Sequence, residues 1–167
     1  MDQVFGTLTI RKISRDEKII RGKLQDSLLL KIGETVLHFL FSEVKVGDKF
    51  QFVIQKSNTD KFRFFFKDLD MNNVLGFVGK PTKVMVSDMY NNVYGTMEQI
   101  QPYPFYNFQE YMIVFEVLEP HWQIYIDDVA VKTFVHRQPF SKIKKIQVDV
   151  GPAVTYLTTA FDPRLSA

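Results

Sequence analysis

Apolar and polar residues alternate with a period of two along much of this chain. The clearest runs lie at residues 50–54, 62–66, 84–86, 122–126 and 146–150. In the second run, Phe62, Phe64 and Phe66 share one side. Successive residues of a strand point to opposite faces of a sheet, so the pattern predicts antiparallel strands with one buried face each.

Turn-forming residues separate these runs at short intervals. They lie at residues 46–48, 57–60, 91–92, 119–120 and 127–128. Many short strands at this spacing are typical of a β-sandwich or a β-barrel. No segment combines a helix start signal with an apolar face over ~10 or more residues. We therefore predict an all-β protein.

The first residues predict a β-hairpin of their own. Residues 4–10 alternate, residues 14–18 form the expected turn, and residues 19–24 return. No stretch rich in Pro, Gly or Ser separates this hairpin from the rest. We predict one domain over residues 1–167, with a hairpin extension at 1–26 and a core at 28–157.

Composition narrows the classes of function. The net charge is only +2, whereas nucleic-acid-binding domains are strongly basic, so no nucleic-acid partner is expected. The basic run at residues 141–145 is interpreted as a solvated strand edge. Since the chain contains 0 Cys, a disulfide framework and a thiolate metal site are both excluded.

The sequence shows no pattern typical of a signal peptide or of a membrane-spanning segment. Residues 1–10 have no basic region followed by an apolar block, so no signal peptide is expected. No apolar run approaches the ~20 residues that span a bilayer. We therefore predict a cytoplasmic location without membrane insertion.

No arrangement of residues predicts catalysis or a metal site. His38, His121 and His136 lie far apart in the sequence and without metal-ligand spacing. Asp127 and Asp128 are adjacent in a turn, where their side chains diverge, so they do not form a catalytic carboxylate pair. We expect neither a cofactor nor an enzymatic activity.

The C-terminal half carries a series of motifs that resembles the galectin family. In order, they are Tyr103-Pro104-Phe105, an apolar strand over residues 111–117, Glu119-Pro120, His121-Trp122, the turn at Asp127-Asp128, and Phe134-Val135-His136-Arg137. The resemblance covers about residues 28–157. It implies a two-sheet antiparallel β-sandwich, the galectin-like jelly roll, to which the N-terminal hairpin is an addition.

The resemblance also implies where a sugar would bind. Galectins use His-x-Asn-x-Arg on one strand, an Asn on the next, and Trp-x-x-Glu-x-Arg on a third. Here the first set falls on Phe65, Lys67 and Leu69, and the second Asn on Asp88. The third set falls on Tyr94, Met97 and Gln99. Only Tyr94 keeps the character of its family counterpart, as an aromatic stacking surface.

These substitutions predict the loss of ordinary galactoside binding. A hydrogen bond to a charged group contributes about 1.5–3 kcal/mol, while a simple sugar bound at micromolar to millimolar strength has only about −4 to −8 kcal/mol. We expect a non-enzymatic binding module that acts through protein contacts, with Arg63, Phe65, Lys67, Asp88, Tyr94, Met97 and Gln99 in its degenerate groove. A lectin for anionic glycans is the alternative, because Arg63, Lys67 and Lys83 suit sulfate or carboxylate.

Two features of this surface stay open in the sequence. Phe65 is either an exposed apolar anchor or is covered by a long connection over residues 68–80. Galectins also pair through sheet edges or back faces, so the hairpin at residues 4–25 either mediates a homodimer or caps one sheet edge.

Overall fold

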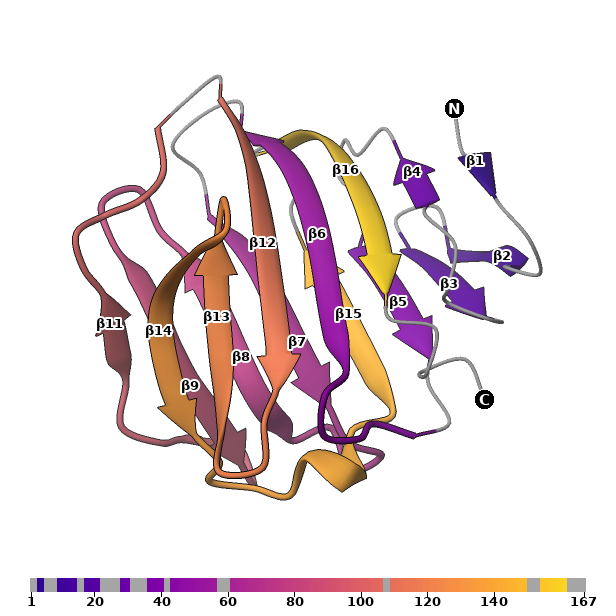
Figure 1. Cartoon of the computed structure of the whole chain (residues 1–167). Coiled ribbons are helices and arrows are strands. Elements are labelled where there is room, and N and C mark those ends of the chain that lie inside the picture. Colours follow the sequence, from indigo (N-terminus) through magenta and orange to yellow (C-terminus); the bar gives the residue numbers. More distant parts are fainter. Residues whose placement is uncertain are drawn as a thin grey trace.

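The computed structural model describes the backbone of residues 3–4, 9–14, 17–21, 28–30, 36–40, 43–56, 61–106, 109–149 and 154–161. Within these ranges the regular elements are β-strands and one short 3-10 helix, η1 (Phe140–Lys142). Two sheets face each other (Figure 1). The predicted all-β sandwich is confirmed.

The first sheet, sheet A, contains seven strands. In spatial order they are β1 (Gln3–Val4), β4 (Leu28–Leu30), β16 (Val154–Phe161), β6 (Lys49–Lys56), β12 (Glu110–Val117), β13 (His121–Ile126) and β14 (Val129–Val135). Neighbouring strands pair antiparallel throughout this sheet.

The second sheet, sheet B, contains nine strands. In spatial order they are β10 (Val93–Tyr94), β9 (Val84–Tyr90), β8 (Asn73–Gly79), β7 (Phe62–Lys67), β15 (Lys145–Asp149), β5 (Val36–Leu40), β3 (Glu17–Arg21) and β2 (Thr9–Ser14), while β11 (Glu98–Ile100) also pairs with β9. One pairing departs from the antiparallel rule, because β3 runs parallel to β5.

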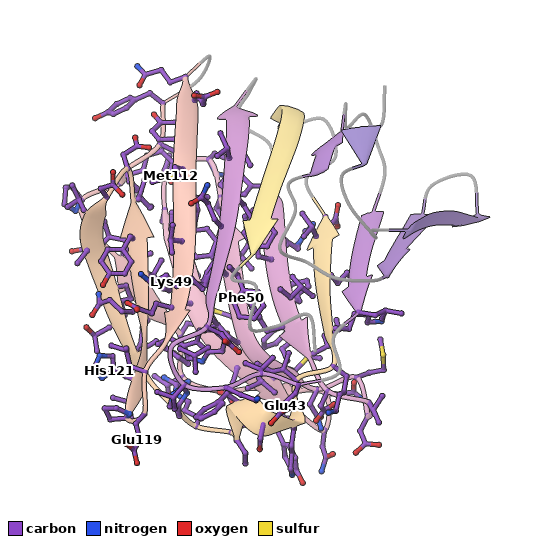
Figure 2. The ribbon with its side chains drawn as sticks, turned by 45° about the vertical axis from the view of Figure 1, so that its right-hand side comes forward. Glu43, Lys49, Phe50, Met112, Glu119 and His121 are labelled. Carbon is purple, nitrogen blue, oxygen red and sulfur yellow. The ribbon has the colours of Figure 1, made fainter. Side chains whose placement is uncertain are left out.

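Aromatic side chains fill the space between the sheets. Phe66 of β7 packs its ring 4.9 Å from that of Trp122 and 5.1 Å from those of Phe50 and Phe115, measured between ring centroids. Phe50 is completely buried, whereas its neighbour Lys49 points outward to Glu116 (Figure 2). The alternation predicted from the sequence is therefore the alternation between core and surface.

The stretch after Phe66 corrects one expectation. Residues 68–80 were expected to form a long connection, but residues 73–79 form β8, which pairs with β7 on one side and β9 on the other. Gly76 and Gly79 make this strand difficult to predict from the sequence, because glycine has a low β propensity. In place of a long connection, only a short turn at residues 68–72 joins β7 to β8.

The N-terminal hairpin is confirmed in part. β2 and β3 pair antiparallel, and β3 attaches them to the β5 edge of sheet B. The first arm begins later than expected, because Gln3 and Val4 form β1 and pair with β4 in sheet A. The tip of the expected turn at residues 15–16 lies outside the described residues.

Two turns in the described part match their sequence signals closely. Asn91 and Asn92 have φ angles of 50° and 63°, and Asp127 and Asp128 have φ angles of 50° and 65°. Two successive positive φ angles define the type I′ turn that suits the twist of a two-residue hairpin, and Asn and Asp tolerate this conformation. Asp127 also accepts a hydrogen bond at Oδ1 from the Met112 N–H at 2.8 Å.

Candidate functional site: a groove on sheet B

A groove of about 220 Å³ lies on the outer face of sheet B. It is lined by residues of β7, β8 and β9 and of the segments flanking them, together with the edge segment that contains β10. The lining residues are Lys61, Arg63, Phe65, Asn73, Gly76, Val78, Lys80, Met85, Ser87, Tyr94 and Met97.

The period of two places these residues on one face. On β7, Phe62, Phe64 and Phe66 are completely buried in the core, so the residues between them face the groove. The sheet register then aligns two rows across the strands. Phe65 is opposite Gly76, which is opposite Ser87, and Arg63 is opposite Val78, which is opposite Met85.

The floor of the groove is the ring of Phe65 lying beside the backbone of Gly76. A Cβ atom at Gly76 would stand 3.3 Å from Cδ1 of Phe65 and 3.4 Å from the carbonyl oxygen of Ser87. Glycine thus leaves the space that the ring occupies. Phe65 is half-buried, and the ammonium of Lys67 lies 5.3 Å from its ring centroid, a cation–π distance.

Three cationic side chains belong to the lining of the groove. They are Lys61, Arg63 and Lys80. Arg63 donates a hydrogen bond from Nη1 to Asp149 Oδ2 at 3.1 Å, and both side chains of this ion pair are about one third exposed. Met85 and Met97 add apolar side chains to the lining. The groove therefore combines an apolar floor with a basic margin.

The wall that carries Tyr94 and Met97 is held by ionic contacts from sheet A. Arg137, which follows β14, donates from Nη1 to the Thr96 carbonyl at 2.6 Å and to Asp88 at 3.2 Å, and from Nη2 to Glu98 at 2.7 Å. Glu98 also pairs with Lys132 of β14 at 2.7 Å. These bonds fix the edge of sheet B against the edge of sheet A.

We expect the Glu98 contacts to make stability depend on pH. Burial alone raises the pKa of the Glu98 carboxyl, but the bonds from Lys132 and Arg137 outweigh it and hold the pKa below the ordinary 4.5. A lowered carboxyl pKa adds stability above the unfolded-state pKa, and this stability is lost as pH falls through the folded-state pKa. Glu98→Gln should therefore lower the free energy of unfolding by about 1 kcal/mol at neutral pH.

Urea denaturation across the acid range measures this effect. The difference between wild type and Glu98→Gln should shrink towards zero in acid, below the lowered pKa. Exposed Glu119→Gln serves as the control and should leave the unfolding free energy unchanged. A difference for Glu98→Gln that stays constant over the whole range would reject the assignment.

The structure brings together only part of the predicted site. Arg63, Phe65, Tyr94 and Met97 line the groove. Three other predicted residues do not line it: Lys67, Asp88 and Gln99. Asp88 is buried and accepts hydrogen bonds from Arg137 and Gln138, while Gln99 is exposed on β11.

The residues that sequence reasoning missed come mainly from β8. The family pattern places its ligands on three successive strands, and β8, β9 and β10 are the successive strands along this edge of sheet B. Along this edge, the first of the three ligand-carrying strands is β8. Gly76 and Val78 of β8, and Lys80 after it, therefore occupy the positions that were expected at Phe65, Lys67 and Leu69. The sequence signal for β8 was the apolar run at residues 74–78. The glycine within this run made it difficult to recognise as a strand.

The described residues contain no group of three or more His, Cys, Asp or Glu side chains that could hold a metal ion. They also contain no helix with the length and apolarity needed to cross a membrane.

The family follows from comparison with known proteins. Residues 47–159 match the sequence model of the galactoside-binding lectins. The chain therefore belongs to this family, the galectins, whose members are non-enzymatic lectins. Comparison with the curated proteins finds no significant match.

Solved galectin structures share the fold at low sequence identity. The Caenorhabditis elegans galectin LEC-6 is similar with a TM-score of 0.71 and 15% identity, over 80% of this chain and 95% of that one. Sheep galectin-11 in complex with glycerol gives 0.65 and 15%, over 78% and 96%. A double variant of human galectin-16 gives 0.67 and 16%, over 74% and 93%.

Proposed function

We propose that this galectin is a non-enzymatic binding module that has lost the usual β-galactoside site and acts through contact with a partner protein. The observation that carries the proposal is the central strand of the groove. β8 presents Gly76, Val78 and the buried Asn73 there, and neither Gly76 nor Val78 offers a side-chain hydrogen-bonding group. Phe65 and Met85 beside them are equally unable to bind sugar hydroxyls.

The surface that replaces the site suits a protein better than a simple sugar. Tyr94 and Met97 are 56% and 45% exposed at its edge, and aromatic residues, Met and Arg are enriched at protein interfaces. The proposal covers one domain over residues 1–167, with the core at 28–157 and the hairpin extension at 1–26. The cytoplasmic location and the homodimer stay predictions.

A galactoside titration and a site-specific crosslink test the proposal. Calorimetric titration with lactose should give no binding heat, whereas a lactose-binding galectin run in parallel should. A photo-crosslinking amino acid at Met97 should capture a partner protein from native lysate. The same group at Val135, 63% exposed on sheet A, is the matched control and should capture nothing. Lactose binding that Tyr94→Ala abolishes would overturn the proposal.

The basic margin favours a second candidate function, a lectin for anionic glycans. Lys61, Arg63 and Lys80 line the groove, and cations bind sulfate and carboxylate groups strongly. A glycan array that includes sulfated chains separates the two candidates. Binding that requires sulfation, weakens with salt and is lost in Lys80→Glu would favour the lectin.

A further inference from the structure

A second hollow lies at the end of β7, and it shares no lining residue with the groove. Its volume is about 380 Å³. The residues lining it are Leu40, Asp68, Leu69, Met71, Lys144 and Lys145. Three of these side chains are apolar, and two are lysines whose stems are also apolar.

The turn between β7 and β8 holds two apolar side chains in solvent beside this hollow. Leu69 is 81% exposed and Met71 is 51% exposed. The Asp68 carboxylate accepts hydrogen bonds from the N–H groups of Asp70 and Asn72 and from the Asn72 side-chain amide, each at 2.9 Å. These hydrogen bonds fix the turn, and its two apolar side chains remain exposed to solvent.

Met71 adopts an unfavourable backbone conformation in this turn. Its φ angle is 66°, in the left-handed region that glycine and Asn occupy more readily. An exposed Met at such a position adds little to the core, so stability does not explain it. Strained backbone of this kind is typical of functional positions.

Lys145 lines the hollow, whereas Lys67, its partner across the strands, does not. Lys67 and Lys145 are directly opposite each other on β7 and β15, and Leu40 of β5 is opposite Lys145 on the other side. Lys67 is only 7% exposed, and no ion pair joins its ammonium to a carboxylate of the described residues. Burial, and then the charge of Lys145, lower the pKa of Lys67. The lysines that line the hollow are Lys144 and Lys145, and the one carboxylate of its lining, Asp68, already accepts three hydrogen bonds from its own turn.

We propose that this hollow is a second binding site, which takes an acidic segment of a partner protein. An apolar side chain of the segment fills the space between Leu69 and Met71. A neighbouring carboxylate lies against Lys144 and Lys145, whose charges it complements. The site is separate from the groove, so the inference holds whether the groove binds a protein or an anionic glycan.

An anionic membrane is the other surface with complementary charge, and Asp70 argues against it. Asp70 is exposed at the tip of the turn, between Leu69 and Met71 in sequence. Insertion of both apolar side chains into hydrocarbon would carry this carboxylate with them, at a high desolvation cost. A protein segment that places one side chain in the hollow leaves Asp70 in water.

A random peptide array probed with the full chain tests the proposal. We expect enrichment of peptides in which an apolar residue is flanked by Glu or Asp, and we expect the binding to weaken with salt. Lys145→Glu should weaken the binding of the enriched peptides at least about tenfold, as expected when one hydrogen bond to a charged group is lost. This change places a carboxylate opposite Lys67 in the strand register, where an opposite-charge pair is favourable. Lys83→Glu, an exposed change of equal charge that lines neither site, and the groove variant Tyr94→Ala should both bind like wild type.

Met71→Asn gives a readout that misfolding cannot imitate. Asn tolerates the left-handed conformation better than Met, so the melting temperature should rise. The apolar wall of the hollow is lost, so peptide binding should fall. A gain in stability together with a loss of binding supports the proposal.

Three results would overturn it. One is an array without enrichment of acidic–apolar peptides. Another is equal binding of the enriched peptides by wild type and Lys145→Glu. The third is binding to phosphatidylserine vesicles that depends on Leu69 and Lys145, because the occupant would then be a lipid surface.

Discussion

Replacing Phe66 by Ala should lower the free energy of unfolding by about 3–5 kcal/mol, the range for a large buried aromatic. The ring is completely buried and contacts Phe50, Phe115 and Trp122 at centroid distances of 4.9–5.1 Å. Its removal opens a cavity between the two sheets, because Phe66 belongs to sheet B and the three rings that contact it belong to sheet A. Urea denaturation followed by far-ultraviolet circular dichroism measures the loss.

Phe65→Ala is the matched control, with the same substitution one position away on the same strand. Phe65 faces the groove and is only half-buried, so the loss should be about 1 kcal/mol. The two variants together test which face of β7 is the core. Equal losses of unfolding free energy would contradict the assignment of Phe66 to the core face and of Phe65 to the outer face of β7.

Asp88→Ala should lower the free energy of unfolding by about 2–3 kcal/mol, the second largest effect after Phe66→Ala. The side chain is buried, accepts from Arg137 at 3.2 Å, and accepts from the Gln138 amide at 2.8 Å. Its removal leaves a cation and an amide with fewer acceptors. Chemical denaturation at neutral pH measures the change.

Asp149→Ala is the control for this second prediction. Its ion pair with Arg63 at 3.1 Å is of similar length, but both partners are about one third exposed. Exposed pairs contribute only about 0–1 kcal/mol. A loss for Asp88→Ala no larger than that for Asp149→Ala would mean that the Arg137 contacts do not hold the groove wall.

The strands with clean alternation were predictable from sequence, and the reason is physical. Around Phe62, Phe64 and Phe66 one face is core and the other is surface, so the pattern reports burial directly. The turns at Asn91-Asn92 and Asp127-Asp128 were equally predictable, because their residues tolerate the positive φ that they adopt.

The groove was only partly predictable, because its floor departs from these rules. β8 has buried residues almost throughout, so it lacks the alternation that marks a half-exposed strand. The role of Arg137 was also hidden, since the residues it binds, Asp88, Thr96 and Glu98, are brought close only when the two sheets meet.

The contact between Phe65 and Gly76 constrains how this binding face can evolve. A side chain at position 76 would meet the Phe65 ring, with even its first carbon 3.3 Å from Cδ1. A polar residue at position 76 therefore requires the half-buried Phe65 ring to shift by a few tenths of an ångström or to be replaced by a smaller side chain. The side chains that positions 65 and 76 can carry are therefore coupled.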